Sequence, residues 1–342
     1  MPLDATANSS TTPALRTRSL AGLLAHQFPK RDFLIHPVLR QGESMMLWAP
    51  TGVGKTMLAL SIALAVAGGG EFIGWRSETP RRVLLVDGEM AVEDLQDRLR
   101  MLLAAVPGID AEAAGRNLRV LARQDQSAAS RFPNLADEGG QDDVLRIARE
   151  HGAELVIADN FSTLAEVADE NEAGAMNPVL TWLLRMKQAR TACILVHHSS
   201  KTGATYRGSS KLATTFEVIL GLEPPDSTGS IGAASFTTRW TKFRGKGHPA
   251  LTSRDVLLSQ TEDGAVVWTE SAAAGDEVRQ FVEAVRTGKH GSQRELAAAL
   301  GWDPSKVSRV KARAVGDRRI SREEVIEALK GALGGSTESP DY

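Results

Sequence analysis

The sequence is poor in cysteine and in aromatic residues. Cys193 is the one cysteine among 342 residues, which excludes an internal disulfide and any zinc site built on paired cysteines. Aromatic residues make up 5% of the chain, and only two of them are tyrosines, which argues against a surface that binds nucleic acid by stacking bases. Low cysteine use fits a reducing compartment, and we expect a cytoplasmic protein.

Long apolar runs are also lacking. The longest apolar stretch, 57–67, is interrupted by Ser61 and is much shorter than the roughly 20 residues that span a bilayer. Residues 1–20 are polar and contain no apolar core of a secretory signal. We therefore expect no membrane partner. With 42% hydrophobic and 24% charged residues, the composition is that of an ordinary globular protein.

The formal net charge of −2 is unevenly distributed. Between Arg286 and Arg322 there are ten Lys or Arg residues against three Asp or Glu residues, which leaves 30 basic and 39 acidic residues in the rest of the chain. A basic module on an acidic body indicates that the two parts meet different partners. DNA is the partner that we expect for the basic module, through contacts to phosphates.

Short apolar runs alternate with amphipathic helical patterns between about residues 40 and 222. This alternation predicts an α/β fold of βα units around a mainly parallel sheet. The expected strands are Ser44–Trp48, Arg82–Asp87, Leu118–Leu121, Leu155–Asp159, Ala192–His197 and Val218–Leu222. The expected helices are Lys55–Ala67, Ala91–Val106, Asp142–His151 and Asn177–Ala189. From Ser235 to Thr269 the pattern changes to strands and turns, which predicts antiparallel strands that close the sheet.

A glycine-rich loop follows the first expected strand and leads directly into a helix. Glycines let successive backbone N–H groups wrap around phosphates, and the helix N-terminus adds the positive end of its dipole. Lys55 can then reach the β- and γ-phosphates, and the Thr56 hydroxyl can bind Mg²⁺. The order of strand, loop and helix predicts a P-loop that binds Mg·ATP. The loop residues are Ala49, Pro50, Thr51, Gly52, Val53, Gly54, Lys55 and Thr56.

Two acidic side chains end strands that we expect beside this loop. Asp159 closes the apolar run ELVIAD, and its carboxylate can hold Mg²⁺ through water. Glu89 follows the run VLLVD, and a carboxylate there can polarise the attacking water. Asp87 is the competitor of Glu89, because residues two apart on a strand lie on the same face.

Three segments carry a resemblance to known families. VDGEMAVEDLQDRLRML, at 86–102, resembles the part of DnaB-type hexameric helicases in which a strand ends in Glu-Met before a helix. This resemblance implies that Glu89 is the catalytic base, and it leaves Asp87 a capping or secondary role. ILVHHSSKTGATYRGSS, at 194–210, resembles the RepA-type plasmid replicative helicases and their RecA-like ATPase relatives. Together with the P-loop, the similarity covers roughly residues 35–260 and implies a RecA-like P-loop NTPase fold.

The resemblance to the RepA-type helicases also implies roles for the residues after the strand at 192–197. It implies that His198 senses the γ-phosphate. Adjacent strand residues face opposite ways, so His197 and His198 are not expected to bind one metal together. Lys201 is a candidate contact to single-stranded DNA in the channel of a ring, or an ordinary solvated lysine. Arg207 matches the family pattern and binds nucleotide or has a structural role.

WTKFRGKG, at 240–247, resembles the Lys-x-Arg-x-Gly turn of the hexameric helicases. The resemblance implies that Lys242 and Arg244 reach across a subunit interface into the ATP site of a neighbour. An arginine supplied in this way is worth about 10³- to 10⁵-fold in rate. Glu217 occupies the position at which the family pattern suggests another basic residue. Arg244 is therefore the remaining candidate for an arginine finger, the arginine that enters the neighbouring ATP site. The alternative is a basic hairpin exposed to solvent.

The basic segment 292–314 has the pattern of a helix-turn-helix. Its apolar residues frame two short helices on either side of the turn Gly301–Pro304, and Ser305 is a natural N-cap for the second helix. The basic residues of that helix have spacings that share a face. The candidate contacts to duplex DNA are Ser305, Lys306, Arg309 and Arg313. Binding to another protein is the alternative role of this unit.

These features predict a chain of several parts and a DNA-directed function. The expected parts are a flexible leader (1–30), a RecA-like ATPase domain (31–270), a linker (271–275), an all-α helix-turn-helix domain (276–331) and a polar tail (332–342). The leading hypothesis is a Mg²⁺-dependent, ring-forming ATPase, a hexamer by analogy, that acts as a replicative helicase of plasmid or mobile-element type. The alternatives are an ATP-switched DNA-binding regulator and a helicase-loader type of ATPase without unwinding activity.

Overall fold

The computed structural model describes residues 15–166, 177–199, 214–224, 234–316 and 319–331. The chain divides into two compact units, Met1–Asp32 and Phe33–Tyr342. The smaller unit contains the short helix α1 (Leu20–Ala25), where the Ser19 hydroxyl accepts a hydrogen bond from the Gly22 backbone N–H at 3.1 Å. In the part of the chain that is described, no helix is both long and apolar enough to cross a membrane.

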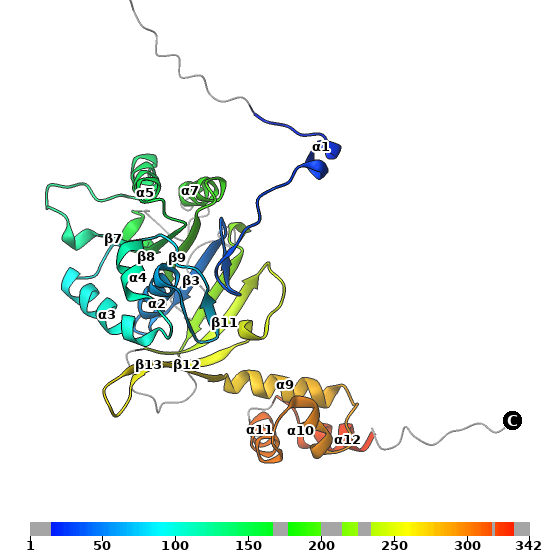
Figure 1. Cartoon of the computed structure of the whole chain (residues 1–342). Coiled ribbons are helices and arrows are strands. Elements are labelled where there is room, and N and C mark those ends of the chain that lie inside the picture. The colour runs from blue at the N-terminus through cyan, green and yellow to red at the C-terminus, as the bar shows by residue number, and fades with distance from the viewer. Residues whose placement is uncertain (1–14, 167–176, 200–213, 225–233, 317–318, 332–342) are drawn as a thin grey trace, which may run out of the picture. The chain divides into compact units, whose positions relative to one another are not determined.

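A nine-stranded sheet forms the centre of the larger unit (Figure 1), in the order β13-β12-β11-β10-β3-β9-β8-β6-β7. The strands from β10 to β7 in this order are parallel to one another. Their bounds are β3 (Ser44–Ala49), β6 (Val83–Asp87), β7 (Leu118–Ala122), β8 (Leu155–Asp159), β9 (Ala192–His198) and β10 (Val218–Glu223). The antiparallel strands are β11 (Ala234–Phe243), β12 (Arg254–Gln260) and β13 (Val266–Ala272). The predicted α/β fold with a mainly parallel sheet is confirmed.

Helices cover both faces of the parallel part of the sheet (Figure 1). On one face lie α2 (Lys55–Gly68), α3 (Val92–Ala105) and α4 (Ala111–Asn117), and on the other lie α5 (Glu138–His151), α6 (Phe161–Leu164) and α7 (Asn177–Gln188). Side chains of β3 alternate between the two cores, with Met45 and Leu47 in one and Met46 and Trp48 in the other. Because both faces are covered, β3 and its neighbours read as continuous apolar runs rather than as alternating ones.

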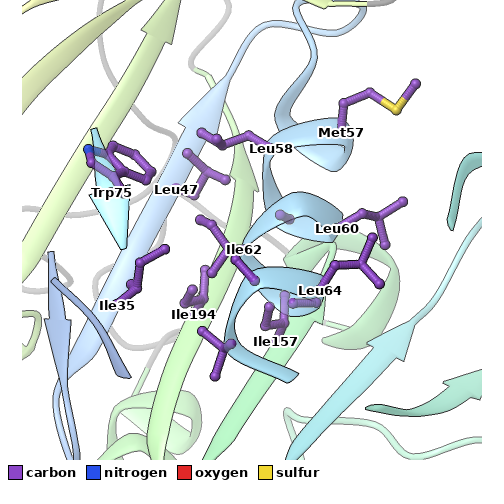
Figure 2. Close-up of a cluster of buried hydrophobic side chains, with 14 of the residues drawn as sticks. Ile35, Leu47, Met57, Leu58, Leu60, Ile62, Leu64, Trp75, Ile157 and Ile194 are labelled. Atoms are coloured by element: carbon purple, nitrogen blue, oxygen red, sulfur yellow. The ribbon is translucent and has the colours of Figure 1, made fainter. Parts of the chain in front are cut away.

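The helix α2 is the most deeply buried of these helices, since all of its residues except Thr56 are buried. Figure 2 shows Leu58 and Ile62 of α2 beside Leu47 of β3 and Ile194 of β9. On another side of α2, the indole Nε1 of Trp268 in β13 donates a hydrogen bond to the Ser61 hydroxyl at 3.0 Å. The helix that begins at the P-loop is therefore held by both the parallel and the antiparallel part of the sheet.

Most elements match the sequence-based prediction to within one residue at each end, with three differences. The helix α5 begins at Glu138, four residues before the predicted start, because the Asp137 carboxylate caps it by accepting from the Gly140 N–H at 2.7 Å. The expected linker 271–275 is wrong: β13 continues to Ala272, and α9 (Ala274–Arg286) begins two residues later. The prediction also missed α4, α6, the helix α1 inside the expected flexible leader, and the two short hairpins β1 (Phe33–Ile35) with β2 (Leu39–Arg40) and β4 (Gly70–Phe72) with β5 (Trp75–Ser77).

Four helices follow the sheet and share a hydrophobic cluster of their own. After α9 come α10 (Gln293–Leu300), α11 (Pro304–Gly316) and α12 (Arg322–Gly331). Phe281 of α9, Leu296 of α10 and Val307 of α11 are fully buried in this cluster. Gly301 ends α10 in a left-handed conformation (φ 67°), so α10 and α11 follow each other through a tight turn.

Gly54 in the P-loop contacts the start of β11 so closely that no side chain fits. A Cβ at this position would lie 2.4 Å from the Ala234 Cβ, and the backbone has φ +114°. We expect Gly54→Ala to lower the free energy of unfolding by about 2 to 5 kcal/mol, from backbone strain plus overpacking. Gly52→Ala is the matched control, because Gly52 has φ +83° but nothing within 4 Å, and we expect a loss of about 1 to 2 kcal/mol. Urea unfolding of the nucleotide-free variants measures the free energy of unfolding of each. If Gly54→Ala and Gly52→Ala lose the same amount, the steric argument is contradicted.

Candidate nucleotide-binding site

The P-loop joins the carboxyl end of β3 to the first turn of α2. In the sheet β3 lies between β9 and β10, so the loop sits at the centre of the edge where the parallel strands end. Ala49 is the last residue of β3 and is fully buried, and Val53 is 8% exposed, so these loop residues anchor the loop. Gly52 and Gly54 have positive φ angles, which turn the backbone N–H groups of the loop toward one side.

A pocket of about 470 Å³ opens above the P-loop. It brings together residues from four parts of the chain that the sequence analysis had singled out separately. From the loop and α2 come Thr51, Gly52, Gly54, Lys55 and Thr56, and from the ends of β6, β8 and β9 come Asp87, Glu89, Asp159 and His198. Asn160, Asp94 and Arg98 also line the pocket, and the sequence analysis did not identify them.

Asp87 and Glu89 differ in what they contact. The Asp87 Oδ1 accepts hydrogen bonds from the backbone N–H groups of Glu89 at 3.1 Å and Met90 at 2.8 Å, so this carboxylate holds the turn before α3. The Glu89 Oε2 accepts from the Asn160 side-chain Nδ2 at 2.5 Å. Asp87 is therefore occupied by the backbone, while Glu89 faces the pocket and is oriented by Asn160. A polar residue directly after the strand-ending Asp159 was the sequence signal for Asn160.

Asp159, Thr56 and Lys55 form the polar floor of the pocket. Burial raises the pKa of the Asp159 carboxyl to about 6, although the Thr56 hydroxyl donates a hydrogen bond to it and the Lys55 ammonium lies nearby. Burial also lowers the pKa of Lys55, and the charges of Asp159 and Glu89 oppose this effect. One hydroxyl oxygen and one carboxylate are hard oxygen ligands, which suit Mg²⁺ when phosphate oxygens and water complete its shell. The residues present therefore fit the expected metal.

The two histidines at the end of β9 point to opposite sides of the sheet. His198 is paired in register with Ala49 and lines the pocket. His197 is fully buried, and its ring packs edge-on against Phe161 with 5.0 Å between ring centroids. The two rings cannot meet at one metal, as strand alternation predicts.

Lys242 and Arg244 lie away from this pocket. Both side chains donate to the backbone carbonyl of Thr214, at 3.4 Å and 2.9 Å, and so lie on the same side of β11. The Arg244 guanidinium also lies 3.8 Å from the Glu217 carboxylate, which pairs with Lys187 at 2.7 Å. Phe243 is in register with Val218 of β10, which is in register with Met45, so this cluster lies at the opposite end of β3 from the P-loop.

The remaining candidates fall into two groups. Lys201 and Arg207 lie outside the described residues. The second group lies in α11, where Ser305 was expected to be the N-cap. The helix begins at Pro304, and the Asp303 Oδ1 accepts a hydrogen bond from the Lys306 backbone N–H at 2.8 Å. The N-cap is therefore Asp303, and the expectation of Ser305 is wrong. Aspartate is as good a capping residue as serine, and Pro304 suits the first helical position.

The structure also separates Lys306 from the other basic residues of α11. The Lys306 ammonium pairs with Glu277 of α9 at 2.8 Å and lies over the Trp302 ring at 4.7 Å, so it stabilises the helical unit from within. Arg309 and Arg313 are exposed, and the Arg309 guanidinium donates to the exposed Ser305 hydroxyl at 3.4 Å. Of the four candidate contacts to DNA, Ser305, Arg309 and Arg313 are therefore exposed, while Lys306 is held by Glu277 and Trp302.

Asp159 makes the stability of the nucleotide-free protein depend on pH. Its pKa of about 6 lies above the ordinary 3.8, so its favourable contribution is complete below about pH 4 and is lost as the pH rises through 6. We expect Asp159→Asn to remove this dependence and to gain stability over wild type between about pH 4 and pH 7, by at most about 3 kcal/mol. Urea unfolding of wild type and Asp159→Asn without Mg²⁺, repeated across this pH range, measures the two free energies of unfolding. A stability difference that is the same at every pH would contradict this prediction.

The match to a protein family supports the identification of the site as a nucleotide site. A family described as an AAA domain matches residues 10–204, more than half of the chain, and this range contains the P-loop, Glu89, Asp159 and His198. Among solved structures, the chain is similar to a KaiC-like protein from the hyperthermophilic archaeon Pyrococcus horikoshii OT3. The two are 17% identical, with a TM-score of 0.47, over 69% of this chain and 93% of that one.

Proposed function

The chain belongs to the AAA domain family of P-loop ATPases, and we propose that it is a ring-forming ATPase that acts on DNA as a replicative helicase of plasmid or mobile-element type. The observation that carries the proposal is the division of the catalytic residues between the two edges of the sheet. The pocket is lined by the glycine-rich loop, by Glu89 as the proposed general base, and by Thr56 and Asp159 as the proposed metal ligands. The basic residues Lys242 and Arg244 lie at the other edge.

Within the pocket each residue has a chemical task. The backbone N–H groups of the loop and the Lys55 ammonium bind the phosphates, and Thr56 and Asp159 hold Mg²⁺, which neutralises charge on the phosphate oxygens when it is bound. Glu89 accepts the proton of the attacking water at a carboxylate oxygen, and the hydrogen bond from Asn160 keeps that carboxylate oriented. His198, beside the end of the P-loop strand, contacts the γ-phosphate and responds to its loss.

Arg244 is too far from the P-loop of its own chain to take part in this reaction. A strand rises about 3.3 Å per residue, so the four steps from Met45 to Ala49 alone separate the two edges by about 13 Å. An arginine there can complete a site only in a neighbouring subunit, which is the arrangement of a head-to-tail ring. A hexamer with Lys201 in the channel follows from the resemblance to the hexameric helicases, and Arg207 beside the nucleotide belongs to the same proposal.

The experiment that tests the proposal is steady-state ATP hydrolysis with and without single-stranded DNA over a range of protein concentrations, followed by unwinding of a forked duplex. A motor of this kind should be stimulated by single strands, and its specific activity should rise as the protein is concentrated. If single-stranded DNA does not change the rate of ATP hydrolysis and the forked duplex is not unwound, the helicase proposal is refuted.

An ATP-switched DNA-binding regulator is the second candidate, and the exposed face of α11 favours it. Ser305, Arg309 and Arg313 form a face that suits contacts to duplex DNA. For this function, the double variant Arg309→Ala/Arg313→Ala should weaken duplex binding by the full chain and lower its salt dependence by about two phosphate contacts. Lys306→Ala is the matched control and should mainly lower stability, since Lys306 pairs with Glu277. Equal effects of both changes on binding would count against this face.

A further inference from the structure

Glu217 directly precedes β10 and is fixed in place by both its backbone and its side chain. Its backbone N–H donates to the Ser44 carbonyl at 3.0 Å, and its own carbonyl accepts from the Arg244 backbone N–H at 3.0 Å. The carboxylate Oε2 accepts a further hydrogen bond from the Ser44 backbone N–H at 2.8 Å. The Glu217 side chain, which is 16% exposed, is therefore held between the first residue of β3 and the residue that follows β11.

Three cations gather around this carboxylate. The Lys187 ammonium of α7 lies 2.7 Å from the Glu217 Oε1, and the Arg244 guanidinium lies 3.8 Å from the same oxygen. Lys242 and Arg244 both donate to the carbonyl of Thr214, three residues before Glu217. Burial and the Arg244 charge lower the pKa of the Lys242 ammonium, and the Glu217 charge opposes this effect. One carboxylate thus faces three cations, and the cluster keeps an excess of positive charge.

The contacts differ in how firmly they hold each cation. Lys187 lies at hydrogen-bond distance from Glu217 and also donates to the Thr215 carbonyl. Arg244 donates to one backbone carbonyl and lies at the outer limit of an ion pair, and its side chain is 55% exposed. A guanidinium has five N–H donors, so these contacts orient Arg244 and leave donors for a phosphate. Without the carboxylate, the three like charges would repel one another, and the exposed arginine would sample many rotamers.

We propose that Glu217 is a positioning residue for Arg244, which it holds at the edge of the sheet from which Arg244 enters the ATP site of a neighbouring subunit. The inference rests on the proposed role of Arg244 across a subunit interface. It also accounts for an acid at a position where the helicase pattern suggests a basic residue, since a fourth cation there would disperse the other three. Glu217 belongs to the chain that donates Arg244. Its loss should therefore impair the neighbour's site and leave the pocket of its own chain intact.

The first test measures the hold on Arg244 without relying on activity. Glu217→Gln removes the charge and keeps an acceptor for the Ser44 N–H, so the strands should stay in place. Phenylglyoxal, which modifies accessible arginines, is added to the dilute, nucleotide-free full chain, and mass spectrometry follows the peptide that contains Arg244. We expect Glu217→Gln to speed modification of Arg244 about two- to fivefold, as the loss of an exposed ion pair predicts. Glu223→Gln is the matched control: Glu223 pairs with Arg239 between the same two strands, so its loss should speed modification at Arg239 and not at Arg244.

The second test is kcat for ATP hydrolysis by the full chain. We expect Glu217→Gln to lower kcat about 10- to 100-fold, because a misplaced catalytic group costs this much, with KM for ATP unchanged. The double variant with Arg244→Ala should be no slower than Arg244→Ala alone, since both changes remove the same interaction. Mixed with Glu89→Ala, Glu217→Gln should partly regain activity. Mixed with Arg244→Ala it should not, because both chains then lack a correctly placed arginine finger. Glu223→Gln should hydrolyse ATP at the wild-type rate.

Any of three results would overturn the inference. Two of them are modification of Arg244 at the wild-type rate in Glu217→Gln and an unchanged kcat of that variant. The third is recovery of kcat when Glu217→Gln is mixed with Arg244→Ala, which would place the defect in the pocket of the Glu217→Gln chain itself. If wild type hydrolyses no ATP, the proposed function fails, and the modification rate alone then decides whether Glu217 holds Arg244. If Glu217→Gln is unfolded by circular dichroism, both tests are run on Glu217→Asp, whose shorter side chain withdraws the carboxylate from Arg244.

Discussion

Replacing Lys55 by alanine is expected to lower ATP hydrolysis at least about 100- to 1,000-fold, because the variant loses the ammonium that contacts the β- and γ-phosphates. In the structure Lys55 is 8% exposed, and its charge is opposed by burial and supported by Asp159 and Glu89. The free protein already bears the cost of burying this cation, so its removal should change the melting temperature by only a few degrees. Circular dichroism and steady-state hydrolysis on the same sample measure both quantities.

Lys246→Ala is the control for this change, since Lys246 is an exposed lysine beyond the pocket. We expect Lys246→Ala to hydrolyse ATP at the wild-type rate. Normal turnover by Lys55→Ala would mean that the loop at 49–56 is not the phosphate-binding element, and the assignment of the whole pocket would then fail.

Arg244→Ala is expected to bind ATP normally and to hydrolyse it about 1,000-fold or more slowly, because the neighbour's site loses the cation that stabilises the transferring phosphoryl group. The same interpretation predicts complementation. A chain with Arg244→Ala still offers an intact pocket, and a chain with Glu89→Ala still offers an intact Arg244. In a random 1:1 mixture, about a quarter of the head-to-tail interfaces combine both intact residues, so activity should partly return.

The matched control for complementation is a mixture of Lys55→Ala with Glu89→Ala. Both residues line the pocket of their own chain, so no interface in that mixture holds a complete site, and no activity should return. Titrating the ratio of the two variants at constant total protein measures the effect. If Arg244→Ala and Glu89→Ala fail to complement at every ratio, Arg244 does not act across an interface. The contacts of Arg244 with Thr214 and Glu217 are then its structural role.

Local features of the chain were predictable because each depends on residues close together in sequence. The P-loop needs only a strand, two glycines and a helix start in direct succession, and the acids Asp159 and Glu89 were found as residues that end apolar runs. The parallel strands were predictable for the same reason: a strand that is buried on both faces shows as an unbroken apolar run. The short hairpins β1–β2 and β4–β5 have no such run and were missed.

The choice between neighbouring candidates needed the tertiary structure. Asp87 and Glu89 have the same residue chemistry and the same strand face in the sequence, and both line the pocket. Only the hydrogen bonds show that the Asp87 carboxylate holds the turn while the Glu89 carboxylate is oriented by Asn160. Lys306 and Arg309 likewise share a helical spacing. Their roles divide because Glu277 of α9 pairs with Lys306, while Arg309 is exposed and donates to the Ser305 hydroxyl.

The sequence by itself therefore determined the α/β class, the phosphate-binding loop and Asp159 as a strand-ending acid, since these follow from composition and spacing along the chain. The tertiary structure alone decided that Asn160 orients Glu89, that Arg98 enters the pocket, and that Arg244 lies at the far edge of the sheet. Those three facts depend on strand register and on the rotation of helices against the core. Both are set by packing between segments that are distant in sequence, which no local pattern records.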